Sequence, residues 1–360
     1  DSTYWNVKSE KLFTTGTAVS LGWDNNSYDS DAQGLLLNPS YNSGLVLGLS
    51  QPLLQGFGRV AQTATLRTTE KQLAAASYLV DSQAADLAAL VKQAYWNLVY
   101  AWQNIEVQKL SLTLAEKLLV ETEEKIKAGK LAQVDIYQPQ SEVAKREESL
   151  IFAERAIGAA DDELKLLLNS EDWLGSFAPV DMPPTDPVEL NLPAILENAL
   201  KIRPDIKAAD LNTEAARIQE ESANNKLLPN LAVTGGVGLA GADDKYGDSV
   251  NNSLSNANNL WQIGLTFSMP LENSTAKGNM QKARAQYSKA KINARLLRQQ
   301  IKKTVRTTIR DVELAIKAID ATQKTTLATL KSLEAEQAKF QSGRSTTLDV
   351  LIAQDAYSQA

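Results

Sequence analysis

The feature that most constrains this chain is an uninterrupted stretch between Gly58 and Gly129 that contains neither proline nor glycine. Within it, apolar residues recur at every seventh position, at Val91, Leu98, Ile105, Leu112, Leu119 and Ile126. Tyr95 and Trp102 add an intermediate position, which is the 4-3 spacing of a coiled-coil seam. The pattern predicts a helix over about residues 57–127. At about 1.5 Å per residue it would be roughly 100 Å long, so it needs packing partners along its course.

A second copy of this seam lies 214 positions further along the chain, with one break of the apolar rule, at Thr326. Its members are Val305, Val312, Ile319, Thr326, Leu333 and Phe340. The residues that follow the long helix repeat at the same offset: Gly129 corresponds to Gly343 and Asp135 to Asp349. We interpret the chain as two copies of one unit: strands, a proline, a long helix, a glycine tip and a return helix.

The predicted first repeat covers residues 1–168 and the second covers residues 194–360, with an irregular, proline-rich connector at 169–193. In the first repeat we expect a β-hairpin at about 11–53, the long helix at 57–127, a tip at 128–133 and a return helix at 134–168. In the second we expect a helix at 194–227, a β-hairpin at 230–270, a long helix at 274–341 and a tip at 342–346. Because few residues follow Gly343, we expect a truncated return helix and an internal fragment of a longer protein.

Three prolines mark the predicted junctions between strands and helices, namely Pro52, Pro229 and Pro270. Proline lacks the N–H that a sheet ladder uses and is accepted in the first turn of a helix, so it suits such a changeover. The loops between the paired strands, at 24–42 and 241–259, are rich in Asn, Asp, Ser and Gly, and we expect them to be solvated loops.

Composition narrows the possible functions. The chain carries 37 basic and 43 acidic residues, a formal charge of −6, and lacks a concentrated basic segment, which argues against nucleic-acid binding. It contains neither cysteine nor histidine. This removes disulfides, thiolate metal sites and the commonest general base, so we expect no cofactor, no metal and no catalytic centre. An enzyme built on Asp161, Asp162 and Glu163 is a weaker alternative, since a solvated helix face explains those carboxylates.

The strands alternate in hydropathy. Leu45, Leu47 and Leu49 occupy one face of their strand, as do Leu231, Val233, Val237 and Leu239 of theirs. Each strand is near the ~9–11 residues that cross a bilayer at a tilt, and Trp23, Tyr41 and Trp261 lie toward the loops, where aromatic rings favour a membrane boundary. Four strands cannot close a barrel alone and open edges are not tolerated in lipid, so several protomers would share one barrel. A soluble sheet edge is the alternative.

Several motifs, taken in order, resemble the TolC-like outer-membrane efflux family, also called outer-membrane factors. They are Gln51-Pro52-Leu53 with Gly56-Phe57-Gly58-Arg59, Ala94-Tyr95-Trp96-Asn97-Leu98, residues 128–135, Arg203-Pro204-Asp205-Ile206, Leu228-Pro229-Asn230-Leu231, and Ser342-Gly343 with 347–351. The resemblance implies a mainly α fold with β-hairpins. A long antiparallel coiled-coil α-barrel would continue a trimeric transmembrane β-barrel that receives four strands from each chain.

The resemblance also implies a function, a location and partners. We expect the outer-membrane channel of a tripartite efflux or type I secretion system, in the outer membrane of a Gram-negative cell and extending into the periplasm. Its partners would be outer-membrane lipid, two sister chains, a periplasmic adaptor and an inner-membrane transporter. The glycine turns would be the periplasmic tips where the channel closes. A soluble coiled-coil scaffold or periplasmic adaptor without a membrane barrel is the alternative.

The resemblance carries over to single residues at the tips. Asp135 matches the family's tip aspartate and Asp349 one of its luminal acids, whereas Ile352 replaces the next acid. Arg344 lies one position early, and Phe340 stands where a gating tyrosine can occur. The tip and gate candidates are therefore Gly129, Asp135, Phe340, Gly343, Arg344 and Asp349. Ordinary helix capping is the alternative role for the aspartates and Thr346.

Overall fold

The computed structural model of the chain describes residues 1–31, 36–183, 190–255 and 259–360. Parts of the two predicted strand loops, and Pro184, Asp186 and Pro187 of the predicted connector, lie outside these ranges. The chain divides into two compact units. The first comprises residues 1–79 and 203–299, and the second comprises residues 80–202 and 300–360. None of the helices within the described ranges is both long and apolar enough to cross a membrane.

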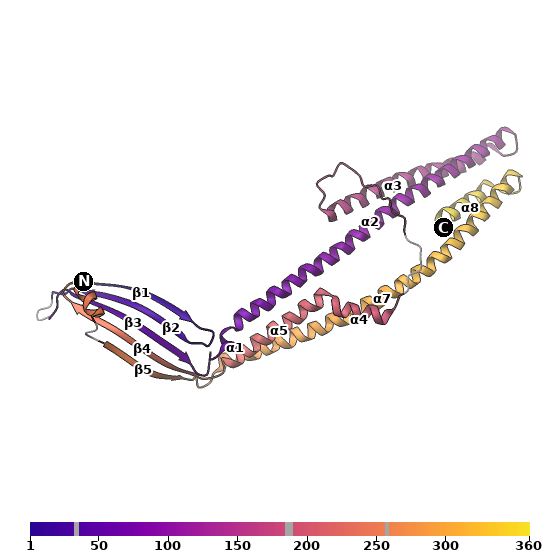
Figure 1. Cartoon of the computed structure of the whole chain (residues 1–360). Coiled ribbons are helices and arrows are strands. Elements are labelled where there is room, and N and C mark those ends of the chain that lie inside the picture. Colours follow the sequence, from indigo (N-terminus) through magenta and orange to yellow (C-terminus); the bar gives the residue numbers. More distant parts are fainter. Residues whose placement is uncertain (32–35, 184–189, 256–258) are drawn as a thin grey trace. The chain divides into compact units, whose positions relative to one another are not determined.

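The first unit contains a five-stranded antiparallel sheet in the order β1-β2-β3-β4-β5, which Figure 1 shows from one side. The strands are β1 (Ser2–Leu12), β2 (Ala18–Tyr28), β3 (Ser40–Pro52), β4 (Asn230–Asp243) and β5 (Asn259–Ser268). The β-hairpin expected at about 11–53 corresponds to β2 and β3, but its expected start is wrong. Residues 13–17 form a turn, with Gly16 at φ 92°, and a further strand, β1, precedes this turn. β1 escaped prediction because its residues, mostly polar, lack a clear alternation.

The two faces of the sheet differ in chemistry. The pairing register aligns Trp23, Leu45 and Leu239 in one row and Leu21, Leu47, Val237 and Trp261 in the next, so all of these side chains share one face. We call this the apolar face. The opposite face carries mostly small or polar residues, for example Ser20, Gly48 and Gly236 in a single row, with Val46 and Leu260 as apolar exceptions. The alternation seen along each strand therefore extends coherently across β2 to β5, because opposite residues in a ladder point to the same side.

A short helix, α6 (Tyr246–Leu254), packs against the loop end of β3 and β4, within a segment expected to be only a solvated loop. Gly241 makes the close approach possible, because a Cβ added there would clash with the Ser249 carbonyl oxygen. The Asn252 side chain donates to Asp243 Oδ2 at 2.8 Å. The Tyr246 ring contacts Trp5 and Tyr41 at centroid distances of 6.3 Å. Aromatic rings thus gather at the loop end of the apolar face.

The junction prolines lie where strands meet helices. Pro52 is the last residue of β3, Pro229 directly precedes β4, and Pro270 lies between β5 and α7 (Ser274–Gln341). The backbone N–H of Leu53 donates to the Leu231 carbonyl at 2.7 Å, and that of Gln55 donates to the Pro229 carbonyl at 3.2 Å. The β-to-α connection of the first repeat and the α-to-β connection of the second are therefore joined by two backbone hydrogen bonds.

The helical segments expected at 57–127 and 194–227 each consist of two helices. The helix expected at 57–127 consists of α1 (Arg59–Gln62) and α2 (Ala64–Lys127), separated at Thr63, whose hydroxyl donates to the Arg59 carbonyl at 2.8 Å. The helix expected at 194–227 consists of α4 (Leu192–Ile202) and α5 (Pro204–Asn225). Pro204 causes this second break, since a residue before proline avoids the helical conformation.

Charged pairs fasten α5 to its neighbours in the first unit. Lys71 of α2 pairs with Glu214 at 2.6 Å, and Arg298 of α7 donates to both oxygens of Asp210 at 2.6 and 2.7 Å. The face of α5 between these pairs is apolar and buried, with Ile206, Ala208, Ala215 and Ile218 all less than a tenth exposed. Such pairs at partly exposed positions contribute about 0–1 kcal/mol each, so apolar burial is the larger contribution to this packing.

The second unit contains the helix pair of the first repeat. The return helix begins with one 3₁₀ turn, η1 (Gln133–Ile136), and continues as α3 (Tyr137–Leu168). Ala94, Leu98 and Leu164 form a buried cluster to which Val91 and Ile157 add. The seven-residue columns of α2 and α3 therefore meet, as in an antiparallel helix pair. α7 continues into this unit and is followed by α8 (Thr347–Gln359).

The described part of the connector is anchored by a buried ion pair at the end of α3. Lys165 Nζ lies 2.6 Å from Asp161 Oδ2, and both side chains are less than a tenth exposed. Asp161 accepts from the Phe177 backbone N–H at 2.9 Å, and Lys165 donates to the Gly175 carbonyl. Burial opposes ionisation of Asp161, but Lys165 and this N–H outweigh it and lower its pKa. The expectation of a solvated carboxylate face is wrong for Asp161 and holds for the exposed Asp162 and Glu163.

Candidate functional site

The candidate site consists of the two helical tips of the second unit, and both are built in the same way. Gly129 and Gly343 adopt positive φ values of 70° and 74°. After α2, the Gly129 N–H donates to Ile126 and the Lys130 N–H donates to Lys125, at 2.9 and 2.8 Å. After α7, Gly343 and Arg344 make the same two bonds, to Phe340 and Lys339, at 3.0 and 2.8 Å. Both helices thus end in a Schellman motif, which explains the glycines.

Asp135 and Asp349, which lie 214 positions apart, cap the helices that leave the tips. Asp135 Oδ2 accepts from the Ala132 backbone N–H at 3.0 Å. Asp349 Oδ2 accepts from the Thr346 backbone N–H at 3.0 Å and from the Thr346 hydroxyl at 2.6 Å. The Asp349 N–H in turn donates to the Thr346 hydroxyl at 3.2 Å, which completes a reciprocal capping box. Because residue 132 is alanine, the first tip has only the carboxylate half of this arrangement.

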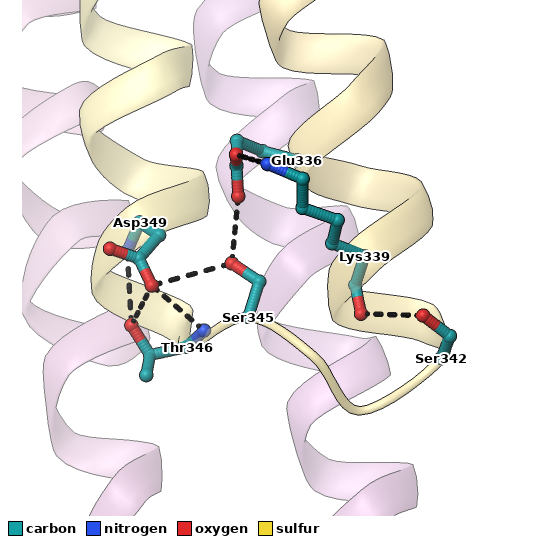
Figure 2. A network of polar contacts seen from close by, with 6 residues as sticks. All are labelled: Glu336, Lys339, Ser342, Ser345, Thr346 and Asp349. Carbon is teal, nitrogen blue, oxygen red and sulfur yellow. Dashed lines mark hydrogen bonds and ion pairs between the residues drawn. The ribbon is translucent and has the colours of Figure 1, made fainter.

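Figure 2 shows how the second tip extends this cap into a network. The Ser345 hydroxyl lies 2.9 Å from Glu336 and 3.4 Å from Asp349, so it bridges α7 and α8. Lys339 Nζ lies 2.5 Å from Glu336 Oε1. The Thr346 hydroxyl, and then its N–H, lower the pKa of Asp349. Lys339, followed by Ser345, lowers the pKa of Glu336. Both carboxylates are therefore ionised at neutral pH.

Phe340 forms the centre of the apolar core beneath this network. It is 1% exposed and packs in a buried cluster whose other members come from α2, α7 and α8: Leu118, Leu333, Val350, Leu351 and Ala353. Lys125 of α2 places its Nζ 3.4 Å from the Phe340 ring centroid and donates to the Phe340 carbonyl oxygen. Burial lowers the pKa of this amine. Lys125 therefore holds α2 against α7 through both a cation–π contact and a hydrogen bond.

Further polar contacts hold α8 against α2 and α3. Gln354 donates to the Leu114 carbonyl at 3.0 Å, and the Ser358 and Ser111 hydroxyls lie 3.2 Å apart. Arg146 of α3 pairs with Glu142 at 2.8 Å and with Asp355 of α8. The Arg344 side chain is exposed, and within the described ranges we find no hydrogen bond or ion pair that engages its guanidinium.

The structure thus brings Phe340, Gly343 and Asp349 together around one tip and leaves Gly129 and Asp135 at the other. Sequence reasoning missed Lys125, Arg146 and Gln354, which connect these helices. Lys125 carried one available signal, because it corresponds to Lys339 at the 214-residue offset. The two lysines nevertheless have different partners, so the offset alone does not predict their contacts.

The comparisons with known proteins agree with this architecture. The family model "Outer membrane efflux protein" matches residues 16–170 and 195–360. The chain is 23% identical over 312 residues to the outer membrane protein TolC of Vibrio cholerae, covering 85% of this chain and 69% of that protein. To TolC of Escherichia coli K12 it is 24% identical, covering 72% of this chain and 54% of that protein.

Among solved structures, the outer membrane protein VceC of Vibrio cholerae matches the whole chain and 80% of its own length, with a TM-score of 0.71 and 17% identity. This likeness supports the fold: mainly helical with an antiparallel sheet. The family match confirms the resemblance noted in the sequence, and with it the expectation of an outer-membrane transport protein that is not an enzyme. The chain therefore belongs to the outer membrane efflux protein family.

Proposed function

We propose that this chain is one protomer of a trimeric exit duct, in which sister chains share one membrane barrel and passively conduct solutes delivered by an inner-membrane transporter through a periplasmic adaptor. Each of the two strand–helix repeats would contribute strands and helices to this duct. The observation that carries the proposal is one sheet with a coherent apolar face and an opposite face of mostly small or polar residues. Its outer strands, β1 and β5, each have one edge without a strand partner among the described residues. In a membrane barrel the apolar face meets lipid and the polar face lines the water-filled lumen.

The extent of the apolar face supports this assignment. On β4 the apolar side chains run from Leu231 to Leu239, which is about 26 Å along the strand at about 3.3 Å per residue. Barrel strands tilt by roughly 35–45° and present an apolar band of about 25 Å. Trp23 and Tyr41 lie toward the loop end of this span, and the polar helix α6 covers the sheet beyond it. Residues suited to a membrane boundary are therefore found next to the apolar span.

The helices also support an assembly. Leu314 and Leu327 of α7 are 62% and 61% exposed, and Tyr100 of α2 is 70% exposed. Helices of this length are stabilised mainly by tertiary packing of their apolar faces, so these faces require partners beyond the single chain. Sister chains around a shared axis would provide them.

At the tips, we propose that the duct closes and the adaptor docks. Opening would separate helix pairs now held by Lys125, Arg146 and the Glu336–Ser345–Asp349 network, and a partner that binds the open form more tightly would shift the equilibrium toward it. Arg344 is exposed beside these groups and is available to a partner. Asp135 would act mainly through the cap it forms with Ala132.

The proposed trimer is tested on the full-length protein extracted in detergent. Light scattering after size exclusion should give three chains per particle, and reconstitution in a planar bilayer should give discrete conductance steps. A monomer, or a protein that stays soluble without detergent, would reject the duct in favour of a rod-shaped scaffold.

The proposed closure of the duct at the tips is tested separately by single-channel recording. Lys125→Met, which keeps the apolar stem but removes the charge that holds α2 to α7, is expected to raise the open probability. Arg344→Ala and Asp135→Ala test the remaining candidates, and Lys130→Ala, at an exposed position of the same turn, is the matched control. If all variants conduct like the parent protein, these residues have no role in a gate.

A further inference from the structure

The edge strand β1 differs from the other four strands in a way that bears on how sister chains meet. β1 pairs with β2 along its whole length, from Ser2 opposite Tyr28 to Leu12 opposite Ala18. It forms one edge of the sheet, and β5 forms the other, as Figure 1 shows. In the shared barrel of the proposed function, on which this inference rests, β5 of one chain must pair with an edge strand of the next.

Strand direction favours β2 over β1 as that edge. Neighbouring strands in this sheet are all antiparallel, so β1, β3 and β5 run one way and β2 and β4 run the other. Around a ring of identical chains, β5 of one chain would meet β1 of the next in parallel, but would meet β2 antiparallel. Bacterial membrane barrels are built from antiparallel strands, so closure through β2 continues the existing ladder and closure through β1 does not.

Side-chain chemistry favours the same edge. In the three rows that contain Leu45, Leu47 and Leu49, strand β2 contributes Trp23, Leu21 and Val19 to the apolar face. In these same rows β1 contributes Val7, Ser9 and Lys11. A lysine on the lipid-facing side of a barrel is destabilising, most of all near the centre of the bilayer. The apolar face is therefore continuous over β2 to β5 and ends at β1.

The family comparison draws the boundary in the same region. The matched residues begin at position 16, in the turn that follows β1, so they include β2 to β5 and leave β1 out. Direction, hydropathy and the family match are independent observations, and each separates β1 from the other four strands.

We propose that the outer edge of β2 is the docking site for β5 of a second copy of this chain, and that β1 occupies this edge only until the copies assemble. β1 would then protect an otherwise open edge, because an unpaired strand is a template for wrong association. On assembly the incoming β5 would replace β1. The exchange substitutes one antiparallel ladder for another, as in other cases of strand addition at a sheet edge.

The test locks β1 to β2 with a disulfide in the full-length protein. Ser9 and Leu21 lie opposite each other, and the 360 residues contain no cysteine that would compete. Oxidised Ser9→Cys/Leu21→Cys should fail to form trimers, and reduction should restore them, which shows that the variant folds. The matched control is Val19→Cys/Leu49→Cys, which locks β2 to β3 and should form trimers in both states. Trimers in the oxidised β1–β2 variant would overturn the proposal.

A cross-linking scan between chains supplies a second readout. Single cysteines at 19, 21 and 23 of β2, and in a second set at 7, 9 and 11 of β1, are combined with cysteines at 261, 263 and 265 of β5. Antiparallel docking predicts that when the cross-linked position moves up in β2 it moves down in β5, so that the sum of the two numbers stays constant. Cross-links from β5 to β1, with a constant difference between the numbers, would reject the exchange. If the parent protein is monomeric, the shared barrel itself is refuted and this inference falls with it.

Discussion

Replacing Phe340 with alanine should loosen the second tip more than any other single truncation in α7. The ring is 1% exposed, is surrounded by side chains of α2, α7 and α8, and lies under the Lys125 amine. Truncating a buried phenylalanine costs about 3–5 kcal/mol, because the apolar contacts are lost and the surroundings relax only partly into the cavity. Lys125 would also lose the ring that shields its half-buried charge.

The assay is hydrogen exchange followed by mass spectrometry on peptides that cover residues 333–341 and 347–357. Since about 1.36 kcal/mol corresponds to a tenfold change, a loss of 3–5 kcal/mol predicts protection factors that fall by roughly two to nearly four orders of magnitude. The fall is limited by the free energy at which the tip opens in the parent protein. Peptides from β3 and β4, in the other unit, should be unchanged.

Phe152→Ala is the matched control, because this phenylalanine lies on α3 in the same unit but is 58% exposed. Surface substitutions of this kind usually change stability by less than about 0.5 kcal/mol, so tip protection should change by no more than roughly threefold. If Phe340→Ala resembles this control, the buried cluster does not hold α7 and α8 together at the tip.

Three further predictions concern local features of the fold. Gly343→Ala should destabilise the tip by about 1–2 kcal/mol, because its φ of 74° is strained for alanine, whereas Gly158→Ala within α3 should stabilise the protein by up to about 1 kcal/mol. Thermal melts in which both variants shift the melting temperature in the same direction would contradict this. Because folding lowers its pKa, Asp349 stabilises the α8 cap above about pH 4 and loses this effect as the pH falls further. Amide hydrogen exchange at residues 346–350, corrected for intrinsic rates, should therefore accelerate at pH 3. An equal acceleration in Asp349→Asn would exclude this carboxylate as the cause. Asp161→Ala should lower the stability by about 3–5 kcal/mol, because it leaves Lys165 buried without its partner, and should expose residues 169–183 to protease. Asp162→Ala, at an exposed position, is the control. Equal cleavage of the two variants would refute the anchoring role of the Asp161–Lys165 pair.

Much of the helical architecture was predictable because its signals are local. A proline restricts its own backbone and that of the residue before it, as the break at Arg203 and Pro204 shows. A glycine at positive φ ends a helix because its own N–H bonds to the carbonyl three residues back and the N–H of the next residue bonds five residues back. Both tips show this pattern. The seven-residue spacing marked the faces of α2 and α3 that meet at Leu98 and Leu164. The expected capping role of the tip aspartates likewise depended on residues only three positions away.

What the sequence by itself determined was therefore the set of long helices, their glycine ends, the alternation of the strands and, through ordered motifs, the family. Only the tertiary structure decided that β1 pairs with β2, that α6 covers the sheet over Gly241, that Lys125 reaches Phe340 and that Asp161 is buried. The physical reason is the sequence distance over which each interaction acts. A local conformational preference is encoded by a few neighbouring residues, whereas the partner of a side chain, and whether water reaches it, depend on segments up to 247 positions apart in the chain.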